Sequence, residues 1–198
     1  MDLPRRAAWL LLPLAAGLVV AGCGLTRAGY ESAPYRVVRK GEGFELRRYP
    51  PIRVAETADQ GDSFLRLFRY IDRNNGDSRK ISMTTPVWMD PVPERPGTMA
   101  FVLPSGLTNP PAPGDGAVRL SERPGGTWAV RRFRGSRQGN DGEALARLRQ
   151  ELSNAGISPT GPARFAYYDP PWIPGFLRRN EAMLPVATET GEGDAGSR

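Results

Sequence analysis

The apolar positions along the chain predict two amphipathic helices. The first follows the capping pair Asp62-Ser63 and ends at the turn sequence of residues 74–76. The second begins at Asn140 or Asp141 and ends at Gly156. In both, the apolar residues recur at the i, i+3, i+4 and i+7 spacing of one helix face. They are Phe64, Leu65, Leu67, Phe68 and Ile71 in the first helix and Leu145, Leu148 and Leu152 in the second.

Eight shorter segments are apolar or alternate between apolar and polar residues, which is typical of β-strands. The order strand, strand, helix, strand, strand occurs twice, at an offset of about 78 residues. A loop rich in proline and glycine joins the two halves. We therefore expect an α+β domain of duplicated β-β-α-β-β units, with about eight strands in a curved antiparallel sheet and two flanking helices. The predicted strands cover residues 44–49, 52–57, 86–89, 99–103, 117–122, 127–133, 164–168 and 181–186.

The N-terminus has the pattern of an export signal. Arg5-Arg6 precedes a wholly apolar stretch at 7–20, which is too short for a comfortable transmembrane helix. The stretch runs into Val20-Ala21-Gly22-Cys23, which resembles the lipobox of bacterial lipoproteins. In such signals the cysteine thiol receives a diacylglyceryl group and a peptidase cuts before it. We therefore expect lipid on Cys23, and Gly24 favours the outer membrane over the inner. The alternative is an ordinary signal that leaves a free thiol.

These features divide the chain into four parts. Residues 1–22 are the lipoprotein signal peptide, and residues 23–34 are the lipidated cysteine and a polar tether. Residues 35–186 form the folded domain. Residues 187–198 lack an apolar anchor and are expected to be a disordered tail. The mature protein is expected in the bacterial cell envelope, anchored to a membrane by its lipid and facing the periplasm.

The composition excludes several kinds of chemistry. The chain has no histidine and one cysteine, Cys23. A Ser-His-Asp triad, a histidine-ligated zinc or heme and a cysteine-rich metal site are therefore excluded. The formal net charge is +6, but the basic residues are scattered and form no nucleic-acid-binding motif. We expect no nucleic-acid partner.

Two motifs carry a family resemblance. They are KISMTTPV at residues 80–87 and YDPPWIPGFLRRNE at residues 168–181. Both closely resemble the SOUL heme-binding protein family, and the resemblance spans essentially all of residues 35–186. It implies two βαββ-like halves that form a distorted barrel with two helices outside. It also implies a hydrophobic groove, which in some members binds heme or another tetrapyrrole. Some members ligate heme through a histidine, a mode that this chain cannot use.

A heme site needs an apolar slot, cations for the propionates and, optionally, an axial donor to the iron. Each candidate also has a plainer interpretation. The apolar stripe can be the core face of its helix, the arginines can be solvated, the methionines and tyrosines can be core or strand residues, and the tryptophan can pin its own loop. The candidates are Phe64, Leu67, Phe68 and Ile71 for the slot, Arg66, Arg69, Arg178 and Arg179 for the propionates, Met83, Met89, Tyr167 and Tyr168 as axial donors, and Trp172 for ligand contact.

The sequence thus predicts a lipid-anchored envelope protein that binds a hydrophobic anionic ligand without catalysis. Heme or another tetrapyrrole is the first expectation, bound non-covalently and without histidine ligation, and no other cofactor is expected. Two alternatives stay open at this point. One is an interaction module of the envelope that binds no ligand, and the other is a hydrolase of hydrophobic small molecules. The oligomeric state is not predicted.

Overall fold

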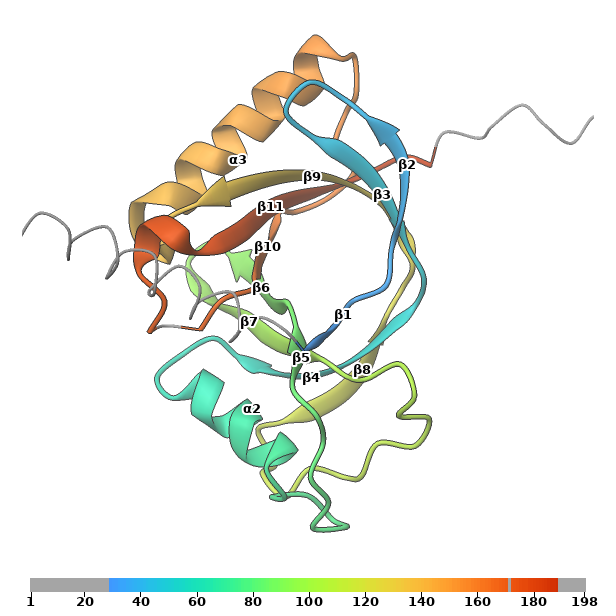
Figure 1. Ribbon diagram of the computed structural model, residues 1–198, viewed down its shortest axis with the longest axis vertical. Coiled ribbons are helices and arrows are strands. Elements are labelled where there is room, and N and C mark those ends of the chain that lie inside the picture. The colour runs from blue at the N-terminus through green and yellow to red at the C-terminus, as the bar shows by residue number, and fades with distance from the viewer. Residues whose placement is uncertain (1–28, 171, 189–198) are drawn as a thin grey trace, which may run out of the picture. The chain divides into compact units, whose positions relative to one another are not determined.

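The computed structural model describes residues 29–170 and 172–188, and the compact unit that holds the sheet begins at Glu31. Nine strands form one antiparallel sheet in the order β2-β3-β9-β11-β10-β6-β7-β4-β8. The sheet curls strongly into a distorted half-barrel (Figure 1), which confirms the predicted α+β class. A separate parallel pair joins β1 (Glu31–Ser32) to β5 (Thr84–Thr85). The nine strands are β2 (Arg36–Lys40), β3 (Glu45–Tyr49), β4 (Ile52–Ala58), β6 (Val87–Val92), β7 (Arg95–Val102), β8 (Arg119–Arg123), β9 (Gly126–Arg134), β10 (Arg164–Tyr167) and β11 (Arg179–Val186).

The strand order shows the predicted duplication. One half is β3-β4-α2-β6-β7 and the other is β8-β9-α3-β10-β11. The counterparts in the two halves are β3 and β8, β4 and β9, β6 and β10, and β7 and β11. When each strand in the order from β3 to β8 is replaced by its counterpart, the same order results, read from the other end. A pseudo-two-fold axis therefore passes between β6 and β10. The first strand of each half pairs with the second strand of the other, β3 with β9 and β8 with β4. The two halves therefore form one sheet and one domain.

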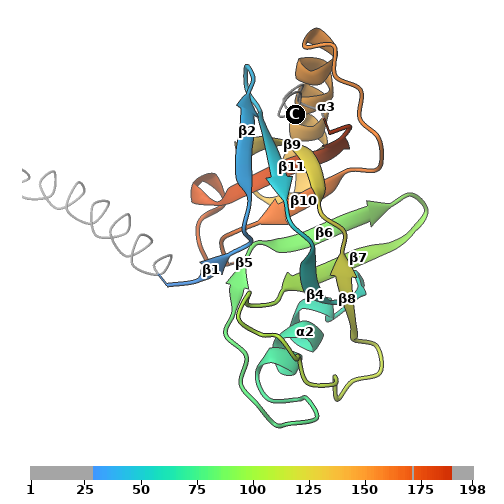
Figure 2. The same ribbon diagram turned by 90° about the vertical axis from the view of Figure 1, so that its right-hand side faces the viewer.

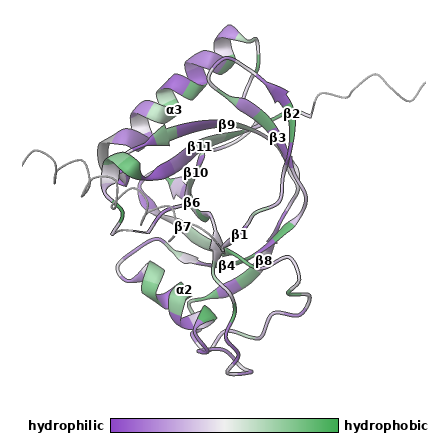
Figure 3. Ribbon diagram, viewed as in Figure 1, coloured by the Kyte–Doolittle hydropathy of each residue, from purple (hydrophilic) through white to green (hydrophobic). Residues whose placement is uncertain are grey.

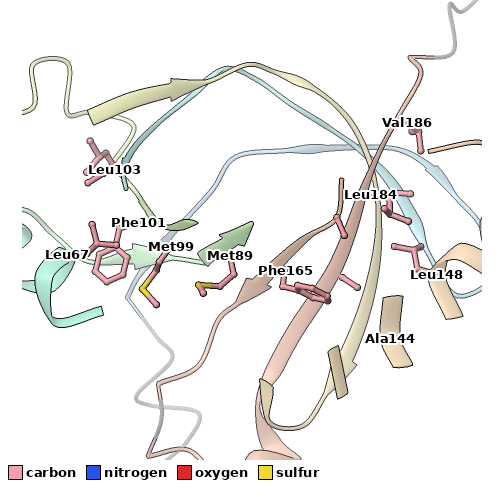
Figure 4. Close-up of a cluster of buried hydrophobic side chains, with 14 of the residues drawn as sticks. Leu67, Met89, Met99, Phe101, Leu103, Ala144, Leu148, Phe165, Leu184 and Val186 are labelled. Atoms are coloured by element: carbon pink, nitrogen blue, oxygen red, sulfur yellow. The ribbon is translucent and has the colours of Figure 1, made fainter. Parts of the chain in front are cut away.

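Two helices, α2 (Ser63–Ile71) and α3 (Arg137–Asn154), lie on the outer side of the curled sheet (Figures 1 and 2). Each buries apolar residues against it, Leu67 and Ile71 from the predicted stripe of α2 and Leu148 and Leu152 from that of α3. The other three residues of the predicted α2 stripe stay exposed. The resulting core is continuous from Leu67 of α2, across Met99 and Phe165 of the sheet, to Leu148 of α3 (Figure 4). Full burial of one such side chain stabilises the fold by about 1.5–3 kcal/mol, so this core holds both helices in place.

The inner face of the sheet has its own core, which combines aromatic and charged side chains. Trp88 is buried there, and the Arg164 guanidinium lies between the rings of Trp88 and Trp128, 4.5 and 4.7 Å from their centroids. Arg47 is fully buried and donates hydrogen bonds from both terminal nitrogens to Glu181, each 3.0 Å long. Because these charges are paired, their burial is tolerated.

The structure extends the predicted elements at three places. β2 is a ninth strand that the sequence pattern does not indicate. The second helix begins at Arg137, one turn before the predicted start, after the N-cap residue Ser136. Within the predicted tether, Glu31–Ser32 forms β1 and Ala33 is buried.

The predicted signal peptide at residues 1–22, Cys23 and residues 189–198 of the predicted tail lie outside the described residues. In the part of the chain that the structure describes, no helix has the length and apolar character needed to cross a membrane.

Candidate functional site

Helix α2 has apolar residues on two faces. Leu67 and Ile71 point into the core and are at most 5% exposed, so they support the helix from beneath and are not free to touch a ligand. Phe64, Leu65 and Phe68 are 45%, 44% and 42% exposed. Figure 3 shows the contrast with α3, whose outward turns are hydrophilic, whereas α2 carries hydrophobic residues around much of its ribbon. The exposed residues of α2 therefore form an apolar surface that burial in the core does not explain.

The two phenylalanines of this surface are held in a fixed arrangement. Phe64 and Phe68 stack with ring centroids 6.3 Å apart and an interplanar angle of only 13°. Phe64 also meets the buried ring of Phe101 edge-on, with centroids 5.2 Å apart. Contacts of this kind stabilise ring positions by about 0.5–1.5 kcal/mol each. We call Phe64, Leu65 and Phe68 the aromatic platform.

A groove of about 290 Å³ opens on the outer side of the sheet. Met89 and Phe165, which face each other on β6 and β10, contribute its apolar lining. Because these two strands flank the pseudo-two-fold axis, the groove lies where the two halves meet. Its volume is at the lower limit for ligand pockets, about 300–1,000 Å³, so it can enclose part of a large ligand but not all of it.

The aromatic platform and the groove belong to one surface of the sheet. Phe101, which supports Phe64, lies opposite Val87 on the neighbouring strand, and Val87 lies opposite Tyr167. Tyr167 lines the groove. Residues opposite one another in adjacent strands point to the same face, so a single cross-strand row leads from the support of the platform to the groove.

Charged groups line the polar side of the groove. Arg137, in the first turn of α3, forms an ion pair with Asp59 at the end of β4. The Tyr167 hydroxyl donates a hydrogen bond to Asp141. Burial raises the pKa of Asp141, while the hydrogen bond from Tyr167 and the charge of Arg137 lower it by less. Burial, and then the bond to Asp141, raise the pKa of Tyr167, so this phenol stays protonated at neutral pH.

Among the predicted propionate partners, Arg69 is an exposed side chain with no ion pair to another described residue. Arg66 forms ion pairs with Asp62 and Asp115, at 3.1 and 3.3 Å. The other two predicted arginines also make internal contacts, which hold the loop before β11. Arg178 donates from Nε to the carbonyl of Ile173 at 2.8 Å, and Arg179 contacts Asp169 with its backbone and guanidinium nitrogens.

The other predicted ligand contacts lie in different surroundings. Met83 is half-buried against the core, and Met89 is 4% exposed. Trp172 is 72% exposed, on the loop that follows β10. The Tyr168 hydroxyl donates to Glu181 at 2.8 Å, and burial together with the Glu181 charge raises its pKa. Neither tyrosine near the motifs is therefore a ready source of phenolate for iron.

The polar side of the groove was missed from the sequence, although Tyr167 was noted. Asp59, Arg137 and Asp141 come from the end of a strand and the first turn of a helix, and only folding brings them together. Arg137 and Asp141 are four residues apart on one helix face, but Asp59 shares no motif spacing with them, so one sequence offers no signal for the group. Among the described residues, no cluster of cysteine and acidic side chains could hold a metal ion.

A duplicated α+β half-barrel, with a partly apolar and partly charged groove where its halves meet, defines the class of domain. Solved structures share the fold. The C-terminal domain of EcmrR matches at a TM-score of 0.56 with 15% identity, over 78% of this chain and 98% of that one. A hydrolase from Listeria innocua matches at 0.55 with 13% identity, over 76% of this chain and 94% of that one. No curated protein matches.

The sequence identifies the family to which the protein belongs. The family model described as SOUL heme-binding protein matches residues 30–185. The chain therefore belongs to the SOUL heme-binding protein family. The match covers both halves of the sheet, both helices and the groove, and it agrees with the family resemblance of the motifs at 80–87 and 168–181.

Proposed function

We propose that this protein binds heme or a related anionic tetrapyrrole on the outer side of its sheet, without catalysis. The observation that carries the proposal is the aromatic platform on α2, which leaves Phe64 and Phe68 stacked and half-exposed on the helix that also carries the exposed cation Arg69. Membership of the SOUL family supports a tetrapyrrole as the ligand. The platform supplies a flat apolar surface, and the groove can receive one edge of the macrocycle.

The residues of this site can hold a tetrapyrrole by apolar contact and by charge, but they offer poor axial ligands for its iron. Arg69 can pair with a propionate, because a guanidinium forms charge-assisted hydrogen bonds to carboxylates. No histidine exists, and the hydroxyls of Tyr167 and Tyr168 are bonded to carboxylates. Binding energy then comes from apolar area removed from water, at about 25 cal/mol per Å². Iron is not required for this contact, so metal-free protoporphyrin should bind about as well as hemin.

A titration of the chain from Gly24 onward with hemin and with protoporphyrin IX tests the proposal, since this chain keeps the compact unit that begins at Glu31. Phe64→Ala combined with Phe68→Ala should weaken both ligands about 30-fold, from about 1 kcal/mol for each half-exposed ring. Arg69→Gln should weaken both by a few fold. Phe176→Ala, at a phenylalanine that is 73% exposed on the turn η1 (Gly175–Leu177), is the matched control and should change neither. Equal weakening in the control would contradict the platform.

The same proposal places the protein on a membrane. A lipid on Cys23 would hold the domain at the cell envelope, facing the periplasm and on the outer membrane in preference to the inner. The support is the lipobox-like sequence that ends at the only cysteine of the chain. Mass spectrometry of the mature N-terminus tests it, with a diacylglyceryl-modified Cys23 as the expected result. A chain that begins at Cys23 with an unmodified thiol would overturn the anchor and leave the tetrapyrrole site untouched.

A second candidate, hydrolysis of a hydrophobic small molecule, rests on the carboxyl of Asp141 in the groove. Its raised pKa and its bond to Tyr167 are features of acid–base groups. The fold is shared with a structure named a hydrolase. Turnover of aryl esters that Asp141→Asn abolishes would favour this candidate. No turnover and no spectral change with excess hemin would favour an interaction module without a ligand.

A further inference from the structure

Four strands share one cross-strand row that ends in two arginines. In this row Val186 of β11 lies opposite Thr127 of β9, and Thr127 lies opposite Arg48 of β3. Arg48 in turn lies opposite Arg36 of β2. Residues opposite one another in adjacent strands point to the same face, so all four side chains lie on one face of the sheet. Val186 and Thr127 are buried, whereas Arg48 and Arg36 are exposed. We call Arg36 and Arg48 the arginine pair.

The charge of the arginine pair is not neutralised within the described fold. Neither arginine forms an ion pair with a residue in the ranges 29–170 and 172–188. Glu45 is the one carboxylate on β2 and β3, and it pairs with Arg47 at 2.8 Å on the opposite face of the sheet. Like charges directly opposite one another destabilise a sheet. An anion that reaches both arginines would relieve this repulsion.

The chain itself continues from the other end of this row. Thr188 follows β11 by two residues, and its hydroxyl lies 3.3 Å from the hydroxyl of Thr127. Adjacent strands lie about 4.8 Å apart, so the arginine pair begins one strand spacing from Thr127 and ends two spacings away. The segment that follows Thr188 is therefore attached directly beside the pair.

The segment at residues 189–194 has the charge that the arginine pair lacks. It holds three carboxylates and no cation; they are Glu189, Glu192 and Asp194. An extended chain spans at most about 3.3–3.6 Å per residue, so six residues have ample length to cross two strand spacings. Attachment at Thr188 makes the contact intramolecular, with an effective concentration on the order of millimolar. Proximity and charge complementarity thus indicate the same occupant.

We propose that the acidic segment at 189–194 crosses β9 and forms ion pairs with Arg48 and Arg36. The inference is independent of the proposed tetrapyrrole site and of the proposed lipid anchor. The segment has no apolar residue, so the contact is electrostatic, and it requires no regular structure of the segment. Every residue of β2 is exposed. The contact would therefore stabilise an edge hairpin that gains little from burial, and salt would weaken it.

Native-state hydrogen exchange of the β2 and β3 amides tests the contact, because it reports the local opening of the hairpin. The chain from Gly24 onward is suitable, since it keeps the compact unit that begins at Glu31. Replacing the carboxylates, by Glu189→Gln, Glu192→Gln and Asp194→Asn together, should speed exchange of these amides about fivefold at low salt, from two exposed ion pairs. In about 1 M salt the difference should vanish, and the amides of α3 should not change in either condition.

Repeating the three substitutions in two arginine backgrounds identifies the partner. With Arg36→Gln and Arg48→Gln in place, they should no longer change exchange of the hairpin amides. The control background, Arg73→Gln with Arg149→Gln, removes the same charge from exposed positions elsewhere and should keep the fivefold effect.

Three outcomes would overturn the proposal. No change in hairpin exchange when the carboxylates are replaced would leave both arginines as solvated charges. An undiminished effect in the Arg36/Arg48 background would assign the carboxylates to another partner. Exchange rates that depend on protein concentration would place the segment on a second copy of the chain.

Discussion

Trp88 and Ala166 face each other across the boundary between the two halves of the sheet, and they are equivalent positions of those halves. They are direct partners in the β6–β10 ladder. They are also 78 residues apart in the chain (166 minus 88), which is the repeat length. At the pseudo-two-fold axis, one half therefore contributes a large buried ring and the other a methyl group, at 3% and 0% exposure. The two side chains share one space, in which two tryptophans would collide and two alanines would leave a void.

This complementarity predicts a non-additive pair of substitutions. Trp88→Ala should destabilise the domain by about 3–5 kcal/mol, because it opens a cavity. Ala166→Trp should also destabilise it, by overpacking. The double swap should lose clearly less than the sum of the two single changes, since each substitution fills or empties the space that the other needs. Urea unfolding of the four proteins measures the coupling, and strict additivity would refute the shared space.

The buried pair of Arg47 and Glu181 should be essential to the inner face. Glu181→Gln removes one of the two carboxylates that face a fully buried guanidinium, while Glu45 stays at 2.8 Å, so it should cost about 1.5–3 kcal/mol. Replacing both partners, Arg47→Met with Glu181→Leu, should cost less than Glu181→Gln alone. The control is Glu143→Gln at the exposed Arg147–Glu143 pair, which should change stability by less than about 1 kcal/mol. Thermal unfolding of the three variants would contradict this role if Glu181→Gln behaved like the control.

The domain should lose stability at alkaline pH through its buried tyrosines. Burial, and then the Glu181 charge, raise the pKa of Tyr49 from 10.0 to about 12, and burial also raises the pKa of Tyr168. The folded state therefore holds these protons more tightly than the unfolded state does. The associated stability is fully present below pH 10 and is lost as pH rises through about 12. For Tyr49 alone the full loss is about 3 kcal/mol.

Urea unfolding between pH 8 and 12 measures this loss. Tyr49→Phe should flatten the decline, because phenylalanine has no proton to lose. Tyr30→Phe, at a tyrosine that is 47% exposed, is the matched control and should leave the decline unchanged. A decline that persists undiminished in Tyr49→Phe would assign the alkaline sensitivity to other groups.

The hemin complex should have a high-spin ferric spectrum that does not change between about pH 5 and 8. Histidine, which would titrate in this range, is absent from the chain. Tyr167 and Tyr168 should not ligate the iron either, because both hydroxyls donate to carboxylates and their pKa values are raised. Absorption spectra in a buffer without amines measure the outcome. A low-spin spectrum typical of two nitrogen ligands would contradict the proposed mode of binding.

Alternation and helical spacing predicted most of the fold because those elements bury one face. The strand at residues 36–40 was missed for the opposite reason. All five of its residues are exposed, so it has no buried face and no alternation. The start of α3 was missed because residues 137–143 are polar and include Gly139 and Gly142, which supply no apolar stripe. The local sequence pattern thus predicts elements that bury one face in the core. It fails for elements that no apolar face holds, such as a strand formed only by backbone pairing with its neighbour.

The candidate site was predictable only in part. The stripe of α2 was visible in the sequence, but its division into a buried face and an exposed platform depends on how the helix lies on β4 and β7. The same holds for the arginines of the second motif. Arg179 carries a charge suited to a propionate, yet Asp169, a side chain with no exposed surface, faces it in the fold. Which charges are free is decided by tertiary contacts.

The exchange of first strands between the halves has a consequence for how such a domain can be divided. Because β3 completes the sheet of the second half and β8 completes that of the first, neither half alone can satisfy the backbone of its own outermost strand. A single half-length chain could close the same sheet only by pairing with a copy of itself. The present arrangement is that of a symmetric homodimer fused into one polypeptide, and two fragments separated in the loop at 104–116 should recombine into the intact domain.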